Sequence, residues 1–429
     1  MIDEYLKIYH DKSIYISSGN EIEYIEGPQS EVAKHNQENV KSVLDSGWLD
    51  EIIRNSVLTQ DENDLIDNGF RNILYKLINS ITSEVGRAIV GLTVLQLTIK
   101  SIVPHQSIRL HKASNNQASF SWRDGIPMRV IDNTYITPKL REYNLLKLNA
   151  DGFMMTRSLA ENYPYTSLYK ANIRGAKSEW IEIVNVIENS PEIALPALKL
   201  IITFLKNRSE QFQNKANDAL SHVNKYLNKI SNFSILKNKL FSFPSISSYS
   251  ARLFEILIHS FYNTVLQDYG LDLFLKPLSQ MRSANKKHGN IGDIELLERP
   301  NTMLIIEAWD AKYGKSYLRD ELEELKDKLE GHPETKLAGF ITNEEPVHNK
   351  EILERKSEIE EIFGITIKIE SINSWFKNSI SLYNITDEMM FLKHWTKMFF
   401  EYLCLKQYEI APIDEPTYNW IEECISSLK

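Results

Sequence analysis

The sequence predicts an α/β protein with a mainly helical N-terminal domain, residues 1–245, and a second domain, residues 246–380, that has a mixed central sheet flanked by helices. Three observations lead to this prediction. Apolar residues recur at helical spacing through most of the first half. A Ser-rich stretch with one Pro, residues 231–250, then interrupts the pattern. Beyond it, helical patterns alternate with short apolar runs bounded by turn residues, which is typical of strands. Residues 381–429 are expected to form a mostly helical tail.

The first hundred residues are expected to form helices and loops that act as a scaffold. Apolar residues follow helical spacing over residues 43–57 and again over 70–81. The pattern shortens over residues 107–122 into a candidate strand, loop and strand. Two helices are then expected over residues 179–204, followed by a long polar helix over 207–230 whose apolar stripe predicts a helix-packing seam.

The net charge of −9 argues against a protein that coats nucleic acid nonspecifically. The charge is nevertheless unevenly spread, because residues 1–100 hold 9 Lys and Arg against 16 Asp and Glu, whereas residues 101–180 hold 11 against 6. The basic segment interleaves Lys and Arg with Tyr, Ser, Thr and Asn, which suits contacts to phosphates and base edges. Residues 101–180 are therefore the candidate DNA-recognition region; a packed domain with a solvated surface is the alternative.

Two cysteines, Cys404 and Cys424, are too few for a disulfide framework or a structural zinc site, which favours a reducing compartment. The first residues have neither the basic start nor the long apolar run of a signal peptide. The most apolar later run, residues 193–205, is broken by Pro196 and Lys199. We therefore expect a cytoplasmic protein without a membrane span.

The second domain is expected to open with an amphipathic helix over residues 251–269 and a strand near 273–278. Residues 289–313 then indicate a β-hairpin, because two apolar runs flank the turn-forming residues Arg299, Pro300 and Asn301. The elements that follow are a helix over residues 318–329, a strand over 336–342, a helix over 351–363 and a strand over 365–369.

The predicted hairpin carries two acids and a lysine. Side chains alternate faces along a strand, so Asp310 and Lys312 project from the same side, with Asp293 on the neighbouring strand. An acid two positions before a lysine occurs four times in the sequence, but only Asp310 and Lys312 follow an apolar strand pattern. The helix before the hairpin adds Glu255, in a polar line opposite its apolar stripe. The alternative is a surface salt-bridge cluster on an unrelated α/β domain.

With this order of elements and these residues, the segment from 251 to about 370 resembles the nuclease core of the PD-(D/E)XK superfamily, the fold of many restriction endonucleases. The resemblance implies that Asp293 is the acid of the second strand, Asp310 the variable acid and Lys312 the lysine. Glu255 would be the acid that the preceding helix often supplies. Gly292 stands where the family pattern has Pro.

A second register of the motif begins at Glu307. It has Trp309 where a lysine would be needed, and Glu307 falls on the opposite face of the strand from Asp310 unless a bulge re-aims it. We therefore predict the register of Asp310 and Lys312. His259 and Tyr262, on the same helix as Glu255, are expected to be structural or to support the site indirectly.

The resemblance implies metal-dependent hydrolysis of DNA phosphodiester bonds. Mg²⁺ prefers carboxylate and carbonyl oxygens, so Asp293, Asp310, the Ala311 carbonyl and Glu255 are the expected ligands. Lys312 is expected to orient or help deprotonate the attacking water, or to neutralise the transition state.

The resemblance further implies a restriction endonuclease that cuts double-stranded DNA as a homodimer. Two other hypotheses remain open: another phage-defence or DNA-repair nuclease, and a noncatalytic DNA-binding or assembly protein with a nuclease-like fold. Cleavage of bare duplex DNA at one short sequence distinguishes the first from the others.

Overall fold

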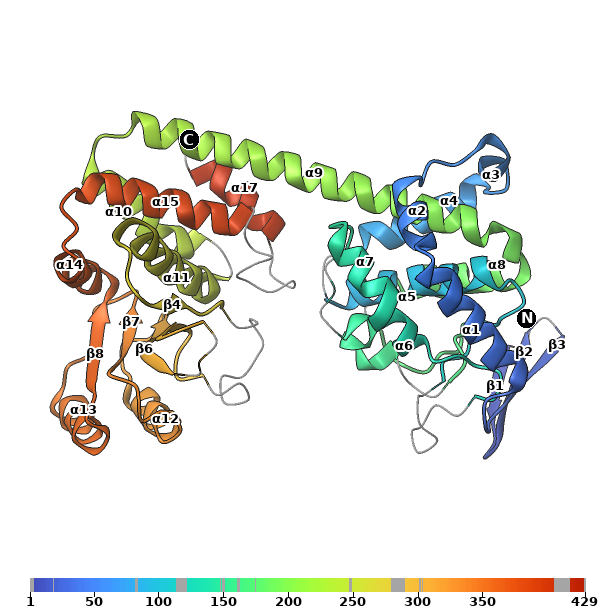
Figure 1. Cartoon of the computed structure of the whole chain (residues 1–429), viewed down its shortest axis with the longest axis horizontal. Coiled ribbons are helices and arrows are strands. Elements are labelled where there is room, and N and C mark those ends of the chain that lie inside the picture. The colour runs from blue at the N-terminus through green and yellow to red at the C-terminus, as the bar shows by residue number, and fades with distance from the viewer. Residues whose placement is uncertain are drawn as a thin grey trace. The chain divides into compact units, whose positions relative to one another are not determined.

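The chain divides into two compact units, Met1–Gln211 and Phe212–Lys429, which are treated separately below. Figure 1 shows the computed structural model and the labels of its elements. The structure describes residues 4–17, 19–81, 84–112, 122–146, 148, 151–159, 163–173, 175–246, 249–278, 290–300, 302, 304–404 and 417–427.

The first unit opens with a three-stranded antiparallel sheet, where the sequence had predicted helices and loops. Its strands are β1 (Tyr5–Ile8), β2 (Lys12–Ser17) and β3 (Asn20–Ile25), in the order β1-β2-β3. Tyr15 and Tyr24 pack one face of this sheet against Leu110 and Trp122. The prediction was wrong because the strands are short and half-exposed, so that polar residues dilute the alternation by which strands are recognised.

A helical assembly makes up most of the rest of the first unit, in agreement with the sequence. Its central element is α5 (Glu84–Ile102), in which Ala88, Leu92, Leu95 and Ile99 are all fully buried. The other helical elements are α1 (Glu31–Asp45), α2 (Trp48–Arg54), α3 (Gln60–Asp64), α4 (Asn68–Asn79), α6 (Met128–Ile131), the π-helix η1 (Asp132–Ile136), α7 (Thr137–Glu142), η2 (Gly152–Met155), η3 (Arg157–Leu159), α8 (Lys177–Asn189) and η4 (Pro191–Ile193).

The strand, loop and strand predicted for residues 107–122 are only partly within the described residues. Within residues 107–112 there is no strand: His111 and Lys112 lie in isolated bridges, that of His111 being to Ile126. Trp122 likewise makes one bridge, to Glu26. Residues 113–121 lie outside the described residues.

The boundary between the two units falls within the 36-residue helix α9 (Ala194–Lys229). Leu198 and Ile201 belong to the core of the first unit, whereas Ala216, Val223 and Leu227 belong to the core of the second. The second unit also includes α10 (Phe233–Ser242) and η5 (Phe243–Ile246). Residues 212–245, grouped with the N-terminal domain in the sequence analysis, thus pack into the second unit.

The second unit is built on a five-stranded mixed sheet in the order β4-β5-β6-β7-β8. Neighbours from β4 to β6 are antiparallel, and those from β6 to β8 are parallel. The elements are α11 (Ser250–Tyr269), β4 (Phe274–Leu275), β5 (Ile294–Leu297), β6 (Ile305–Lys312), α12 (Arg319–Leu329), β7 (Leu337–Thr342), α13 (Lys350–Phe363), β8 (Thr366–Ser371), α14 (Ile372–Leu382), α15 (Glu388–Cys404) and α17 (Thr417–Ser427). The predicted α/β class, with a mixed sheet flanked by helices, is confirmed.

Two separate cores cover the two faces of this sheet. Ile294, Trp309 and Ile341 pack on the side of α11, α14 and α15. Ala308 and Phe340 pack on the side of α12 and α13. Figure 1 shows these two groups of helices on opposite sides of the strands. A side chain on β5 or β6 is therefore assigned to a layer by its parity along the strand.

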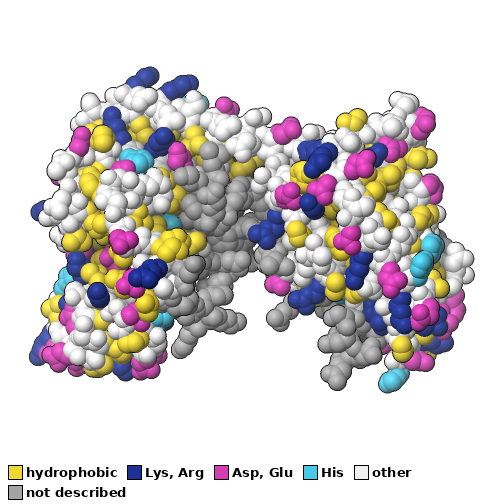
Figure 2. Space-filling view, in the orientation of Figure 1, with side chains coloured by type: hydrophobic (Ala, Val, Ile, Leu, Met, Phe, Trp, Pro, Cys, Tyr) yellow, Lys and Arg dark blue, Asp and Glu magenta, His cyan; other side chains and the backbone are white. Residues whose placement is uncertain are grey.

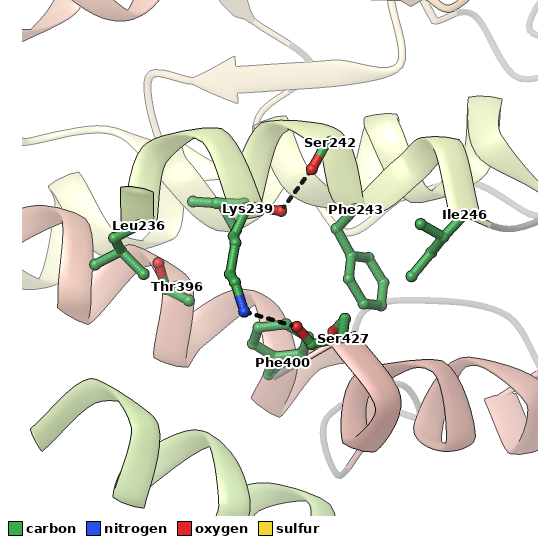
Figure 3. A pocket seen from close by; sticks show the side chains of 9 residues that line it. Leu236, Lys239, Ser242, Phe243, Ile246, Thr396, Phe400 and Ser427 are labelled. Carbon is green, nitrogen blue, oxygen red and sulfur yellow. Dashed lines mark hydrogen bonds between the residues drawn. The ribbon is translucent and has the colours of Figure 1, made fainter. Parts of the chain in front are cut away.

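A cavity of about 80 Å³ lies among α10, η5, α15 and α17 of the second unit (Figure 3). Leu236, Phe243 and Phe400 line it, and Lys239 Nζ donates a hydrogen bond to the Ser427 carbonyl at 3.0 Å. That hydrogen bond fastens the end of α17 to α10. None of the helices in the described ranges is long and apolar enough to cross a membrane.

Candidate functional site

The structure brings Asp293 and Asp310 to facing positions on adjacent strands. β5 and β6 pair with Ile294 opposite Trp309 and Glu295 opposite Ala308, so continuing the register by one residue places Asp293 opposite Asp310. Both side chains have the parity of the layer that holds α12 and α13. Asp293 Oδ2 accepts a hydrogen bond of 3.0 Å from the Ala311 amide, which fixes its carboxylate against β6.

Lys312 joins these two acids. Two residues beyond Asp310 on the same strand, it projects from the same face, and its Nζ lies 2.9 Å from Asp310 Oδ2. The other carboxylate oxygen, Asp310 Oδ1, is buried and has no hydrogen-bond partner among the described residues. The structure therefore brings together three of the predicted site residues and leaves one buried acceptor without a donor.

The two aspartates titrate in opposite directions. Burial, reinforced by the charges of Asp310 and Glu255, raises the pKa of Asp293 well above its usual value. Burial alone would also raise the pKa of Asp310, but Lys312 and a hydrogen bond to Asp293 hold it below its usual value. Burial disfavours the Lys312 ammonium, yet Asp310 and Asp293 raise the pKa of this lysine. Without a cation, burial and the neighbouring charges thus disfavour the charged form of Asp293, whereas Lys312 favours that of Asp310.

Gly292 is explained by the distance between the strands. A Cβ at this position would lie 2.6 Å from the Trp309 carbonyl oxygen and 2.8 Å from the carbonyl carbon. No side chain other than hydrogen fits without a backbone shift. The departure from Pro at this position thus allows the chain to pass close to β6 directly before Asp293.

Glu255 is near the site but is bonded elsewhere. It lies on α11, whose Phe254 ring is 5.8 Å from that of Tyr313, just beyond β6. Its Oε2 accepts a hydrogen bond from the buried Arg252. Burial raises the pKa of Glu255 against the opposing effect of Arg252, and the charges of Asp310 and Lys312 also act on it. Glu255 is thus electrostatically coupled to the site while its carboxylate is held by Arg252.

Glu307 lies in the opposite layer from Asp310. Its Oε1 accepts hydrogen bonds from Tyr262 Oη at 2.7 Å and from Trp309 Nε1 at 2.6 Å, so it ties α11 to the sheet. His259 Nε2 is 3.0 Å from the Lys276 carbonyl oxygen, and burial lowers the pKa of His259 to about 4. These contacts are structural, and Glu307 does not converge on the facing aspartates.

Four further charged residues surround the site, and the sequence analysis did not identify them. Glu295, which is buried, and Lys276, which is half-buried, form an ion pair of 2.6 Å beside the backbone that leads to Asp293. Glu321, a buried residue of α12, acts on Lys312 electrostatically, and Lys328 acts on Asp310. In the sequence, Glu295 could have been recognised only because it lies two residues after Asp293 and so on the same face of the strand. Lys276, just after β4, and Glu321 and Lys328, in α12, are remote from Asp293 in the sequence.

The oxygen donors of the site are two facing carboxylates. Among the described residues, no three or more His, Cys, Asp or Glu side chains form a cluster able to hold a metal ion. Mg²⁺ is commonly bound by one or two carboxylates while it keeps several waters. The facing carboxylates of Asp293 and Asp310, with the buried, unpartnered Asp310 Oδ1, satisfy this smaller requirement. They fit a hydrated Mg²⁺; the structure does not add Glu255 to the set.

The predicted basic segment, residues 101–180, uses most of its described cations internally. Arg109 donates to the Tyr165 carbonyl and to Asn185, and Lys112 donates to the Gly27 carbonyl. The remaining internal pairs are Arg123 with Asp124, Arg129 with Asp151, Lys139 with Asp50 and Glu142, and Lys177 with the carbonyls of Tyr169 and Ala171. Figure 2 likewise shows Lys and Arg mixed with Asp and Glu on the visible face of this unit. Lys147, Arg174 and the side chain of Arg157 lie outside the described residues.

No protein-family model matches the chain, and no curated protein matches it significantly. The chemistry of the site has to be derived from its own residues.

Proposed function

We propose that the second unit is a Mg²⁺-dependent endonuclease that hydrolyses phosphodiester bonds in double-stranded DNA. The observation that carries this proposal is the convergence of Asp293, Asp310 and Lys312 at the paired ends of β5 and β6. Hydrolysis of a phosphodiester needs an activated water and positive charge near the phosphate. Two carboxylates able to hold a hard cation, beside one ammonium, provide both requirements.

Asp293 and Asp310 would hold the metal ion, together with the Ala311 carbonyl. When bound, Mg²⁺ supplies Lewis acidity to the phosphate and lowers the pKa of a coordinated water. The protein must place its carboxylates beforehand, and it does so through the Ala311 amide on Asp293 and through Lys312 on Asp310. Preorganised charges of this kind need no reorganisation during the reaction.

Lys312 remains charged at neutral pH, because Asp310 and Asp293 raise its pKa. An ammonium can donate hydrogen bonds to the attacking water or to a phosphate oxygen, and it offsets the negative charge that develops in the transition state. In the metal-free site the two carboxylates favour this ammonium form, which suits orientation of the water and charge neutralisation.

The more specific role, a restriction endonuclease acting as a homodimer, follows from the resemblance of residues 251 to about 370 to the PD-(D/E)XK superfamily. The order of elements and the strand register described above support that resemblance. The first unit would then contribute to reading the DNA sequence. Light scattering tests the dimer directly, since the chain mass is 49.8 kDa and a homodimer has twice that mass.

Plasmid cleavage tests the proposal. Wild type is expected to cut with Mg²⁺ and not with EDTA, whereas Asp310→Ala and Lys312→Ala should each lose most of the activity. Asp327→Ala and Lys350→Ala remove exposed charges on α12 and α13 and serve as controls. Equal cutting by a site variant and wild type contradicts the site, and cutting in EDTA contradicts the mechanism. DNA binding without cleavage under all conditions supports the noncatalytic hypothesis instead.

A further inference from the structure

Glu295 is a buried carboxylate that the mechanism above does not use. It is 2% exposed and lies on β5, two residues after Asp293 and on the same face. Its Oε1 accepts hydrogen bonds from the amides of Ile291, at 2.6 Å, and Gly292, at 3.3 Å. Both donors belong to the two residues directly before Asp293.

Lys276 completes this arrangement. It follows β4, and its Nζ lies 2.6 Å from Glu295 Oε2 and 2.8 Å from Asn290 Oδ1. We call Glu295, Lys276 and Asn290 the Glu295 clamp. A carboxylate this deeply buried needs charge-assisted partners, and they come from Lys276, just after β4, and from the backbone that leads into β5.

The clamp acts on the same short backbone segment that holds Asp293. On one side of Asp293, the amides of Ile291 and Gly292 are bonded to Glu295. The side chain of Asp293 is held from the neighbouring strand β6, because its carboxylate accepts a hydrogen bond from the Ala311 amide. The hydrogen bonds to Glu295 hold the amide side of this segment, while Lys328 Nζ donates to the Ile291 carbonyl at 3.1 Å and the Trp309 backbone packs against Gly292.

We propose that Glu295 is a positioning residue for Asp293: through the Glu295 clamp it holds the backbone of Ile291 and Gly292 so that Asp293 faces Asp310 and bonds to the Ala311 amide. That Glu295 thereby affects metal binding rests on the proposed function. That it holds the backbone of Ile291 and Gly292 does not depend on that function. The carboxylate of Glu295 is bonded to the amides of Ile291 and Gly292 and to Lys276. It therefore affects the site through the position of Asp293.

The test compares Glu295→Gln with wild type. Gln keeps the shape and one acceptor oxygen, but it loses the ion pair and presents an amide donor to the Lys276 ammonium. Lys276→Met removes the ion pair with Glu295 by changing the lysine instead of the acid. Lys276→Arg keeps the positive charge and should keep the ion pair. Glu298→Gln is the matched control, because Glu298 is an exposed acid just beyond the same strand.

Hydrogen–deuterium exchange of the full chain without metal is the first measurement. Losing a charge-assisted hydrogen bond is expected to speed exchange at Ile291 and Gly292 about tenfold or more. Exchange at the Ala311 amide should become faster together with exchange at Ile291 and Gly292 in Glu295→Gln and Lys276→Met. In Lys276→Arg and Glu298→Gln, exchange at all three amides should stay as in wild type. A structural role confined to the 290–292 segment would leave Ala311 unchanged, which would overturn the proposal. Unprotected amides at Ile291 and Gly292 in wild type would overturn it without any variant.

The second measurement is the Mg²⁺ concentration that gives half-maximal cleavage. It should rise by about tenfold in Glu295→Gln, because misplacing one carboxylate weakens the metal site while the other groups stay in place. A metal dependence equal to that of wild type, with Asp293 still bonded to Ala311, contradicts the positioning role. If wild type does not cleave DNA at all, the proposed function fails, and the exchange measurement still decides on the clamp.

Discussion

Asp293 and Asp310 show how position decides the chemistry of identical side chains. Asp310 is buried and Asp293 half-buried at the paired ends of two strands, yet the pKa of Asp293 is raised and that of Asp310 is lowered. Lys312, which lies 2.9 Å from Asp310, lowers the pKa of Asp310, and the hydrogen bond between the two aspartates lowers the pKa of Asp310 while it raises that of Asp293. The charged form is thereby favoured at Asp310 and disfavoured at Asp293.

Gly292 provides a prediction at this scale. In Gly292→Ala the new Cβ would meet the Trp309 carbonyl at 2.6 Å, and backbone atoms cannot move aside as a flexible side chain can. We expect a loss of about 1–3 kcal/mol in the free energy of unfolding, together with loss of DNA cleavage as Asp293 is displaced. Urea unfolding and plasmid cleavage measure the two effects. Gly331→Ala is the control, since its Cβ would meet only the Lys328 carbonyl oxygen, at 3.7 Å. Wild-type behaviour of Gly292→Ala would contradict the close approach of the strands.

A second residue-scale prediction concerns Asp132, a fully buried acid of the first unit. Its oxygens accept hydrogen bonds from the Phe153 amide at 2.9 Å and from the Thr137 hydroxyl at 3.0 Å, yet burial raises the pKa of Asp132 from 3.8 to about 6. A raised pKa means that the folded state binds the proton more tightly. The stability contributed by protonated Asp132 is therefore fully present below pH 4 and is lost as the pH rises to about 6, a change of about 3 kcal/mol.

His111 opposes this effect, because burial lowers its pKa from 6.5 to about 4, so its contribution is lost as the pH falls through the same window. The free energy of unfolding of wild type should therefore depend only weakly on pH in this window. Asp132→Asn removes the first contribution and keeps hydrogen-bonding capacity for both neighbours. We expect the free energy of unfolding of wild type minus that of Asp132→Asn to fall by about 3 kcal/mol between pH 4 and 7. Urea unfolding at several pH values measures it, and a constant difference would refute the raised pKa.

At the scale of elements, the parallel and antiparallel halves of the sheet have different roles. β6, β7 and β8 form the parallel half; β7 is covered on both faces and reads as an apolar run, whereas β8, at the edge, alternates and buries Ile367 and Ile369. β5 and β6 form the antiparallel half, and its register places the acids face to face. The site therefore lies on the strand pair β5–β6, where the register decides which side chains face each other.

Helix α13 gives an element-scale prediction. It begins after Asn349, whose Oδ1 accepts a hydrogen bond of 2.9 Å from the Ile352 amide, and it packs Ile352 and Ile359 against the sheet. Asn349→Ala leaves that amide without its cap and should lower the free energy of unfolding by about 1 kcal/mol. Urea denaturation measures the change. Lys350→Ala, at the neighbouring and largely exposed position, should change stability by less than about 0.5 kcal/mol. Equal effects of the two substitutions would mean that the cap does not stabilise the helix.

At the scale of the whole molecule, α9 belongs to two cores. Its first half packs into the first unit and its second half, with α10, packs into the second. The Ser-rich stretch that suggested a boundary at residue 245 therefore lies inside the second unit and not between domains. Leu236, Leu240 and Phe243, within that stretch, are all buried.

Two fragments test this division. Residues 212–429 contain the whole second core and should fold with a cooperative urea transition. Residues 246–429, cut at the boundary suggested by the sequence, lose Val223, Leu227, Leu236 and Leu240 from that core. Each buried side chain of this kind contributes about 2–5 kcal/mol, so the four together contribute as much as the roughly 5–15 kcal/mol that stabilises a whole domain. The shorter fragment should therefore be unfolded, and circular dichroism distinguishes the two outcomes.

The sequence by itself determined the α/β class, the order of elements from α11 to β8, and the choice of Asp293, Asp310 and Lys312 as candidates. Each depends on periodicity or on side chains close together in the chain, which local patterns report. The sheet β1–β3 was missed because its strands are short and half-exposed. The continuity of α9 was missed because only packing shows that its two halves belong to different cores.

Only the tertiary structure decided which partners the candidate residues have. Glu255 proved to be bonded to Arg252, Glu307 to Tyr262 and Trp309, and most described cations of residues 101–180 to internal acceptors. Glu295 and Lys276, 19 residues apart, came together beside Asp293. The physical reason is the same throughout: a buried charge takes the partner that the packing of strands and helices provides, and that packing joins segments whose separation in the sequence carries no signal.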